Sequence, residues 1–354
     1  MRRLTAPLAA LAVTLALAAP TLACGGLIGP NGAVNLLRTT TLAGYHNGVE
    51  HYVTAFQFAG GGGSFGSIVP LPGIPTSVVR GGDWTLQRLV RETNPPQEDG
   101  FFSLGAAAAS PRAIVLQQVR IDALDITILK GGGAEIGVWA KDHGFSLPPD
   151  APEVLDFYAE RSPIFMAASF DADAAAARGQ AIGDGTPVHL TIPTKNPWVP
   201  LRILGLGKTA SEVVQADVYL LTDDRPALLP DPDSILAAGG LKLTHSDEAS
   251  AQLLTDLRTD KGMEWVPKSA WLSKIEIDAK ATDLRFDLAI DASGAGKPSL
   301  KDAGFAPFGP LPAPPSWTLM WVTLLAISLA VPLGGAWLVV AATRSAGGRP
   351  LAGG

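Results

Sequence analysis

The chain has 354 residues, of which 47% are hydrophobic and 17% are charged, with 39 glycines, 29 prolines and one cysteine. It is too apolar and too weakly charged to be a disordered polymer. A single cysteine excludes an intrachain disulfide and any metal site built on several cysteines. The formal charge is −6, so the sequence lacks the basic excess that is typical of nucleic-acid-binding proteins.

Residues 1–23 have the pattern of a secretory signal peptide. Arg2 and Arg3 precede an apolar core of 12 residues at positions 8–19, and small residues follow near Ala23. This core is too short to span a bilayer, which needs about 20 residues. We predict a cleaved signal peptide, with an uncleaved N-terminal anchor as the alternative.

Cys24 follows directly after this predicted signal, where a lipoprotein signal places its acylated residue. Such signals prefer Leu three positions upstream, and here that position is Thr21. Lipidation of Cys24 is one candidate role, and a free thiol or an intermolecular disulfide outside the cell are the others. A chain terminus is a poor place for a catalytic thiol, which needs a base and a defined pocket.

Residues 24–290 predict an α+β domain with mixed or antiparallel sheets and several short helices, because strand and helix patterns mix without regular βαβ alternation. The strongest hairpin signal is Asn47-Gly48. Strands are predicted at residues 34–42, 49–58, 67–71, 113–129 (two strands around Asp122), 164–170, 188–192, 201–204, 213–221 and 272–278. Helices are predicted at residues 84–93 capped by Asp83, at 134–143 ending at Gly144, at 151–161 with an Asp150/Glu153 capping box, and after a Ser246 cap through Leu253, Leu254 and Leu257.

Pro70 and Pro72 are singled out as candidate binding residues. Proline cannot donate to a sheet ladder, so these residues predict a rigid edge strand and turn. The functional alternative is the rigid lip of a binding groove.

Motifs that resemble catalytic or ligand sites are incomplete. Ser64 lies in a G-x-S-x-G pattern, but the following prolines forbid the helix that a nucleophile elbow needs. The Gly205–Thr209 stretch lacks the first glycine of a phosphate loop and predicts a turn. His46 and His51 could meet across their hairpin, although a surface histidine pair is the commoner outcome.

Clustered acids also fall short of a site. The pairs Asp223/Asp224 and Asp231/Asp233 flank a proline-rich turn, where a weak calcium site is the minor alternative to turn and cap hydrogen bonds. Glu153, Asp156 and Glu160 indicate a solvated helix face rather than a pair of catalytic acids. The sequence therefore predicts no metal site and no cofactor, and leaves the catalytic residues unknown.

The C-terminal part predicts a membrane anchor. Residues 291–316 are rich in Pro, Gly and Ala and indicate a linker. Residues 317–342 hold no charge and would form about 39 Å of helix, enough to span a membrane. Trp317, Trp321 and Trp337 lie near its two ends, where aromatic residues concentrate at membrane interfaces.

The flanking charges predict the orientation of this helix. Arg344 and Arg349 follow it and no acid does, so the positive-inside rule places a short tail, residues 343–354, in the cytoplasm. We expect the N-terminal domain of this single-pass membrane protein to lie outside the cytoplasm. Residues 24–316 then carry 23 basic and 33 acidic residues, a net charge of −10, which argues against nucleic acid as a partner.

Small residues recur at every fourth position of the predicted membrane helix, at Ala326, Ala330 and Gly334. Such a stripe lets two helices approach closely. Besides the membrane itself, the candidate partners are therefore a second copy of this helix or the helices of other membrane proteins.

Several segments in order resemble one protein family. They are Ala23-Cys24-Gly25-Gly26, Phe56-Gln57-Phe58, Ile68-Val69-Pro70-Leu71-Pro72-Gly73, Trp84-Thr85-Leu86, Trp139 to Gly144 followed by Phe145-Ser146-Leu147-Pro148, and Pro200-Leu201-Arg202. Over residues 23–290 the chain resembles the DUF2330 family, bacterial exported proteins of undetermined function that are often membrane-anchored. Members often carry further cysteines near the first, whereas Ile28-Gly29 stand here. The family supplies no catalytic residue.

Together these features predict an outward-facing binding or scaffolding module at the bacterial cell envelope, and they lean against an enzyme. The alternative is an exported hydrolase whose active-site residues converge from separate strands, which spacing along the sequence does not reveal.

Overall fold

The computed structural model describes residues 26–29, 32–33, 39–56, 66–94, 114–171, 174, 177–178, 186–232, 239–292 and 298–304. The chain divides into two compact units, Met1–Phe305 and Ala306–Gly354. All described residues belong to the first unit, and the elements below are those of its described part.

The strands are β1 (Gly26–Gly29), β2 (Gly32–Ala33), β3 (Thr39–His46), β4 (Val49–Phe56), β5 (Gly66–Pro70), β6 (Ser77–Arg80), β7 (Ile114–Ile121), β8 (Leu124–Lys130), β9 (Ile164–Phe170), β10 (Thr186–Pro193), β11 (Trp198–Val199), β12 (Val213–Thr222), β13 (Ala227–Leu229), β14 (Leu241–Glu248), β15 (Trp271–Lys280) and β16 (Leu288–Asp291). The helices are α1 (Thr85–Thr93), α2 (Gly133–Asp142), α3 (Ala151–Ala159) and α5 (Ala251–Thr259), with 3₁₀ turns η1 (Arg202–Gly205) and η2 (Ala281–Asp283). The fold class is α+β, as predicted.

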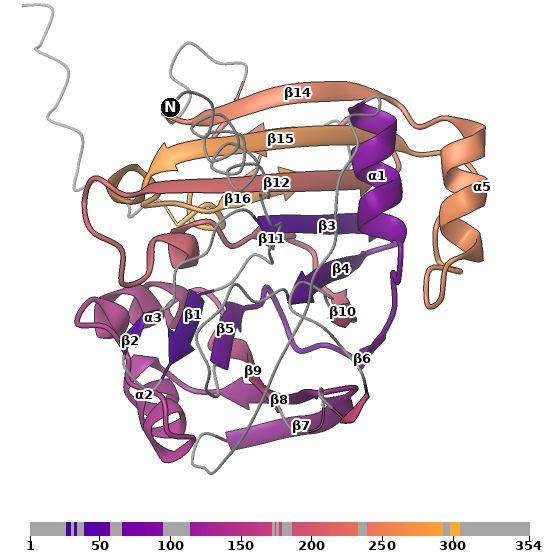
Figure 1. The fold of residues 1–354 in the computed structure, drawn as a ribbon. Coiled ribbons are helices and arrows are strands. Elements are labelled where there is room, and N and C mark those ends of the chain that lie inside the picture. Colours follow the sequence, from indigo (N-terminus) through magenta and orange to yellow (C-terminus); the bar gives the residue numbers. More distant parts are fainter. Residues whose placement is uncertain are drawn as a thin grey trace, which may run out of the picture. The chain divides into compact units, whose positions relative to one another are not determined.

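Three sheets organise the described strands (Figure 1). A seven-stranded sheet has the order β14-β15-β12-β3-β4-β10-β6, a six-stranded sheet β2-β1-β5-β9-β8-β7, and a three-stranded sheet β11-β16-β13. Pairing is antiparallel except between β12 and β3, which run parallel. The predicted hairpins are present: Asn47 and Gly48 both adopt positive φ between β3 and β4, and Asp122 does so between β7 and β8.

The two faces of the seven-stranded sheet bury different clusters. On one face, Leu42, Val53 and Tyr219 pack against leucines of α1 and α5, two helices that lie side by side in Figure 1. On the other face, residues such as Tyr52 and Leu220 join the larger core that also includes the six-stranded sheet and α2 and α3. Because alternate residues of each strand point to opposite faces, neighbouring residues of one strand belong to different clusters and to different candidate sites.

Several local predictions are wrong. Residues 201–204 do not form a strand but lead into the 3₁₀ turn η1, where backbone N–H groups bond to the Asp287 carboxylate and the Tyr158 hydroxyl instead of to a ladder. Ser246 lies within β14, and the residue that caps α5 is Ser250, which accepts a hydrogen bond from Leu253 N–H at 3.1 Å.

The predicted caps of α1 and α3 also differ. Asp83 does not cap α1; the Asp260 carboxylate, from a distant loop, accepts the Trp84 N–H at 3.0 Å and the Thr85 hydroxyl at 2.7 Å. Asp150 precedes α3 but accepts the Gly207 N–H instead of a helical N–H. In each case a tertiary contact replaces the local one that the motif suggested.

Pro70 is not on an edge strand. It ends β5, which lies between β1 and β9 in the interior of the six-stranded sheet. The pairing of β5 with β1 covers only residues 66–68, so the missing N–H of Pro70 falls beyond that ladder. This is how a proline is tolerated in an interior strand.

The predicted signal peptide, Cys24, the later part of the linker and the predicted membrane helix at residues 317–342 lie outside the described residues. Among the helices described, none has the length and apolar character needed to cross a membrane. The membrane topology therefore stays a prediction.

Candidate functional site

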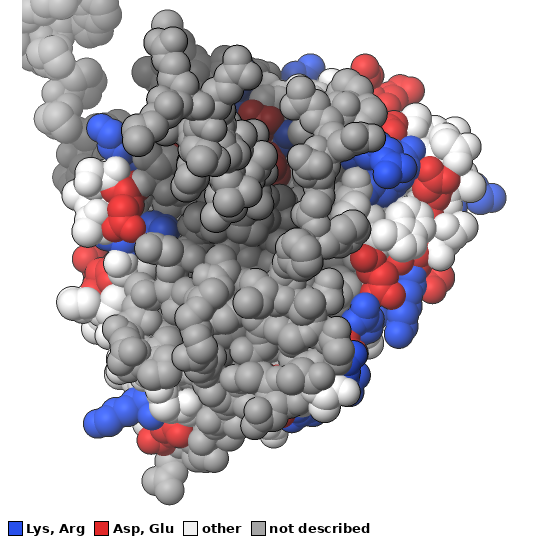
Figure 2. Space-filling model, viewed as in Figure 1, with Lys and Arg blue, Asp and Glu red and all other residues white. Residues whose placement is uncertain are grey.

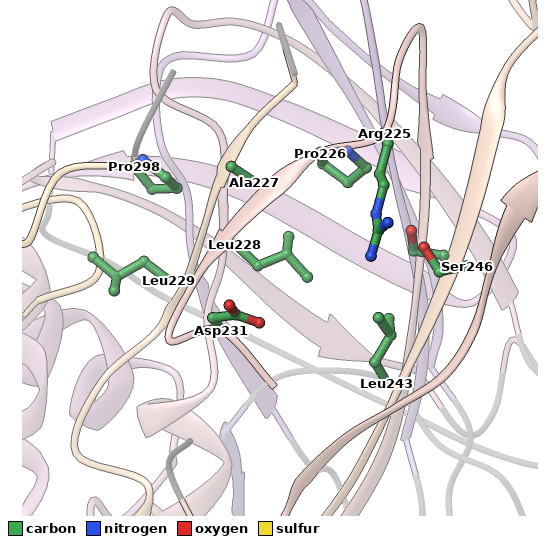
Figure 3. Close-up of a pocket in the computed structure, with 10 residues that line it drawn as sticks. Arg225, Pro226, Ala227, Leu228, Leu229, Asp231, Leu243, Ser246 and Pro298 are labelled. Atoms are coloured by element: carbon green, nitrogen blue, oxygen red, sulfur yellow. The ribbon is translucent and has the colours of Figure 1, made fainter. Parts of the chain in front are cut away.

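A cavity of about 570 Å³ lies between β13 and the β14–β15 edge of the seven-stranded sheet. We call it the β13–β14 cavity. Its lining is Arg225, Pro226, Ala227, Leu228, Leu229, Asp231, Leu243, Ser246, Ser273 and Pro298. Ser273 pairs with Leu220 in the ladder, so the cavity opens on the sheet face opposite α1 and α5. Figure 3 shows Arg225 reaching in between Leu228 and Ser246, with the Asp231 carboxylate facing the same space from another side.

The chemistry of the cavity is mixed. Leu228, Leu229 and Leu243 supply apolar surface, while Arg225 and Asp231 bring opposite charges and two serines bring hydroxyls. Arg225 lies over the Trp271 ring at 6.0 Å from its centroid, and the Trp271 indole N–H donates to Ser246 Oγ at 3.0 Å. An apolar wall with a few converging polar groups is the usual character of a small-ligand site.

A buried ion network fixes the small sheet that carries one wall of the cavity. Asp287, fully buried just before β16, accepts hydrogen bonds from the Tyr158 hydroxyl at 2.8 Å and the Leu201 N–H at 2.7 Å, and it pairs with Arg161. Arg161 lies over the rings of Phe157 and Trp198 at 4.4 and 4.8 Å. Because β16 pairs with β13, this network holds the Leu228 and Leu229 side of the cavity in place.

Glu50 on β4 is a second unusual group. Its side chain is fully buried on the large-core face, and neither carboxyl oxygen has a hydrogen-bond partner among the described residues. Burial raises the pKa of Glu50 to about 8, although the Trp198 backbone acts in the opposite direction. Glu50 is therefore a neutral acid at pH 7.

His51 and His189 form a buried pair on the opposite face of the same sheet. His51 Nδ1 lies 3.0 Å from His189 Nε2, and the Trp265 ring stacks on His51 at 3.9 Å between centroids. Burial, together with the neighbouring imidazoles, lowers the pKa of His51 to about 3, and burial lowers that of His189 to about 4. Both rings are neutral at pH 7.

The predicted meeting of His46 and His51 takes another form. Both lie on the same sheet face, but His46 Nδ1 contacts Asp223 Oδ1 at 2.5 Å and its Nε2 contacts the Asn47 amide at 2.7 Å, whereas His51 contacts His189. Within the described residues, no cluster of three or more His, Cys, Asp or Glu side chains could hold a metal ion.

The other predicted site residues are dispersed. Cys24 and Ser64 lie outside the described residues. Pro70 is buried and Pro72 half-buried, and neither lines the β13–β14 cavity. The Gly205–Thr209 stretch forms a turn, with Gly207 at positive φ. Asp231 lines the cavity, Glu153 pairs with Arg202, and Asp156 accepts the N–H of Gly133 at the start of α2.

The sequence did not predict most residues of these sites. The cavity residues of β13 and β14, and His189 of β10 beside His51 of β4, come together only through the order of strands in the sheets. The Arg225-Pro226 and Asp231-Pro232 pairs inside a short turn-rich segment were the one local signal, and they were interpreted as a turn. Acidic and basic side chains are interspersed over the described part of the face seen in Figure 2.

The described residues form an α+β domain with a partly open cavity at β13 and β14. The chain belongs to the DUF2330 family, described as an uncharacterized protein conserved in bacteria, whose model matches residues 18–258. No curated protein matches the chain.

Among solved structures, the chain is similar to baculovirus P35. A mutated P35 after caspase cleavage, at 2.7 Å resolution, shares 10% identity with a TM-score of 0.36, over 72% of this chain and 99% of that one. A second such structure, at 3.1 Å, gives 7% identity and a TM-score of 0.39 over 73% and 98%. A further crystal structure of P35 gives 9% and 0.34 over 75% and 96%.

Proposed function

We propose that this protein is a single-pass membrane protein of the bacterial envelope whose N-terminal domain faces outward and binds a small ligand in the β13–β14 cavity. The observation that carries the proposal is the cavity itself: its volume of about 570 Å³ lies within the range of small-molecule sites. The signal-like N-terminus and the uncharged stretch at residues 317–342 support the location.

The lining favours an amphipathic ligand over a purely apolar one. Three leucines give it apolar contact, while Arg225, Asp231 and the serines bring both charges and hydroxyls to the same cavity. A site of this composition recognises a molecule by orientation as well as by burial. The network around Asp287 fixes the wall that carries Leu228 and Leu229, which supports a preformed binding surface.

Thermal-shift screening of the full chain in detergent tests the proposal. A ligand present at 100 times its Kd stabilises the folded chain by about 2.7 kcal/mol, a shift of several degrees. Leu228→Trp fills the cavity and is expected to abolish the shift, whereas Ile74→Trp, at an exposed position, is expected to keep it. A shift that persists in Leu228→Trp would contradict ligand binding in this cavity.

The location is tested separately by protease accessibility. Protease added to intact cells, or to spheroplasts of a bacterium with an outer membrane, is expected to digest the domain and to spare a tag on the C-terminal tail. Digestion of the tail with protection of the domain would reverse the proposed orientation.

A hydrolase is the second candidate, favoured by the His46–Asp223 contact. An imidazole held at Nδ1 by a carboxylate is one half of a nucleophilic site, but His46 Nε2 contacts Asn47. Covalent labelling with a serine-reactive probe tests this reading: labelling that disappears in Ser64→Ala and in His46→Phe would support a hydrolase, and absence of labelling argues against it.

A further inference from the structure

The loop between α5 and β15 is pinned across the helix-bearing face of the seven-stranded sheet. We call residues 260–270 the Trp265 loop. Asp260 at its start caps α1, and the Lys261 carbonyl accepts the Gly82 N–H at 2.8 Å. Met263 and Val266 are buried. The loop thus joins α1, α5 and the strands beneath it.

The loop covers the two imidazoles of His51 and His189. Trp265 lies parallel to His51, with 1° between the ring planes, and 6.2 Å from His189. His51 is 8% exposed and His189 4% exposed. The imidazoles come from adjacent strands, since His189 pairs with Val53 and His51 with Thr191 in the β4–β10 ladder.

Glycines allow this close approach. A Cβ on Gly44, the residue opposite His51, would lie 2.1 Å from the Trp265 ring. A Cβ on Gly81 would lie 3.0 Å from the Lys261 carbonyl oxygen. The closed position of the loop therefore requires glycine on the sheet at both contacts, at Gly44 beneath Trp265 and at Gly81 beside Lys261.

The contact nevertheless holds unsatisfied polar atoms. His189 Nδ1 and Trp265 Nε1 are buried and make no hydrogen bond of ordinary geometry within the described part of the chain. Buried polar atoms without partners weaken the packing that covers them. The loop is closed by stacking and shape, with little hydrogen bonding to the imidazoles.

We propose that the Trp265 loop is an acid-operated latch, closed over two neutral imidazoles and released when both take up protons. Two imidazolium ions with nitrogens 3.0 Å apart would repel each other and lose hydration under the indole. Opening of the loop admits water, which restores the hydration of both rings and screens their repulsion. The opened loop would uncover a His-Trp surface on the face opposite the β13–β14 cavity.

The groups around the pair offset this cost only in part, since burial outweighs those that favour the protonated rings. His46, on β3, acts on His51 as a further cation when protonated. Glu264, exposed on the loop itself, is the carboxylate that favours protonated His189, and the Gly262 backbone acts in the same direction. Lys261 is exposed on the loop, and Arg80, on β6, directs its side chain to Asp83 and Asp122.

Linkage sets the size of the effect. Closed, the imidazoles titrate at about 3 and about 4; open and hydrated, they approach the ordinary pKa of 6.5, which sets the upper limit of the effect. Opening therefore takes up two protons below pH 6.5, and the open fraction rises up to about 100-fold per pH unit, roughly 1000-fold between pH 7.5 and 5. Glu50, on the other sheet face, stays buried when the loop opens.

Amide hydrogen exchange of the full chain in detergent tests the latch. The reporters are Gly82, Met263 and Val266, whose N–H groups donate to or within the loop, and rates are divided by the intrinsic rate at each pH. From pH 6 to 5 their opening constant should rise about 50-fold. Strand β12, inside the seven-stranded sheet, is expected to open only with global unfolding and should show about 7-fold, because Glu50 then releases one proton. Equal slopes at loop and strand would overturn the latch.

Variants assign the protons to the pair. His51→Phe keeps a ring beneath Trp265 and should reduce the rise in the loop opening constant between pH 6 and 5 from about 50-fold to about 7-fold, because one proton remains. The matched control His245→Phe, on β14, should keep the full slope. If His51→Phe fails to fold, histidine C2–H exchange in the unaltered chain decides. Exchange at His51 that accelerates on acidification in step with the loop amides would support the proposal, and a titration of His51 near 6.5 while the loop amides stay protected would overturn it.

Discussion

The stability of this protein should pass through a maximum near pH 6.5, because three buried groups titrate in opposite directions. Glu50 binds its proton up to about pH 8 when folded, but only up to 4.5 when unfolded. Its stabilisation is complete below pH 4.5 and is lost as the pH rises to 8. His51 and His189 bind protons below 6.5 only in the unfolded chain, down to about 3 and 4. Their stabilisation is complete above 6.5 and is lost as the pH falls.

The slopes follow from the number of protons exchanged. Between pH 4.5 and 6.5 the unfolded chain binds two protons on the histidines that the folded chain does not, and the folded chain binds one on Glu50. The net difference of one proton raises the free energy of unfolding by about 1.4 kcal/mol per pH unit. Between 6.5 and 8 only Glu50 acts, and the free energy falls by about 1.4 kcal/mol per unit.

Glu50→Gln isolates the carboxyl, since glutamine has nearly the shape of the protonated acid. It should remove the decline above pH 6.5 and steepen the acid limb to about 2.7 kcal/mol per unit. The assay is urea unfolding of the full chain in detergent at half-unit pH steps, with the exposed Glu248→Gln as control. An unchanged pH profile in Glu50→Gln would refute the reasoning, because it would mean that Glu50 is charged or solvated in the folded chain.

Three further substitutions have defined outcomes. Gly44→Ala should destabilise the chain by about 1–3 kcal/mol and shift Trp265 emission to the red, because the new Cβ overlaps the indole; unchanged emission in a difference spectrum would contradict this. Asp287→Ala should cost about 3–5 kcal/mol in urea unfolding, since it leaves a buried guanidinium unpaired, and a cost below 1 kcal/mol would refute that. Asp260→Ala should cost at least about 1 kcal/mol by loss of the α1 cap, whereas Asp83→Ala should change stability by less than about 0.5 kcal/mol; equal costs would show that the cap is wrongly assigned.

Much of the secondary structure was predictable because its signals are local. Asn47-Gly48 and Asp122 predicted two hairpins, and the positive φ at these positions confirms the turn chemistry. Gly144 adopts positive φ after α2, as a C-terminal glycine should. Family membership was likewise recognisable from short segments in order, and it is confirmed.

Non-local contacts account for what was missed. Residues 201–204 are apolar enough for a strand, but their N–H groups are taken by Asp287 and Tyr158, 86 and 45 residues away. Asp260 caps a helix that begins 175 residues earlier. Such partners have no sequence spacing that identifies them, and the cavity depends on them for its wall.

Native mass spectrometry of the full chain, extracted gently from its own membrane, tests the central claim most directly. The account predicts a retained small-molecule mass in the unaltered protein and in Ile74→Trp, and its loss in Leu228→Trp. The same adduct in all three proteins, or a bare chain in the unaltered protein, would contradict ligand binding in the β13–β14 cavity.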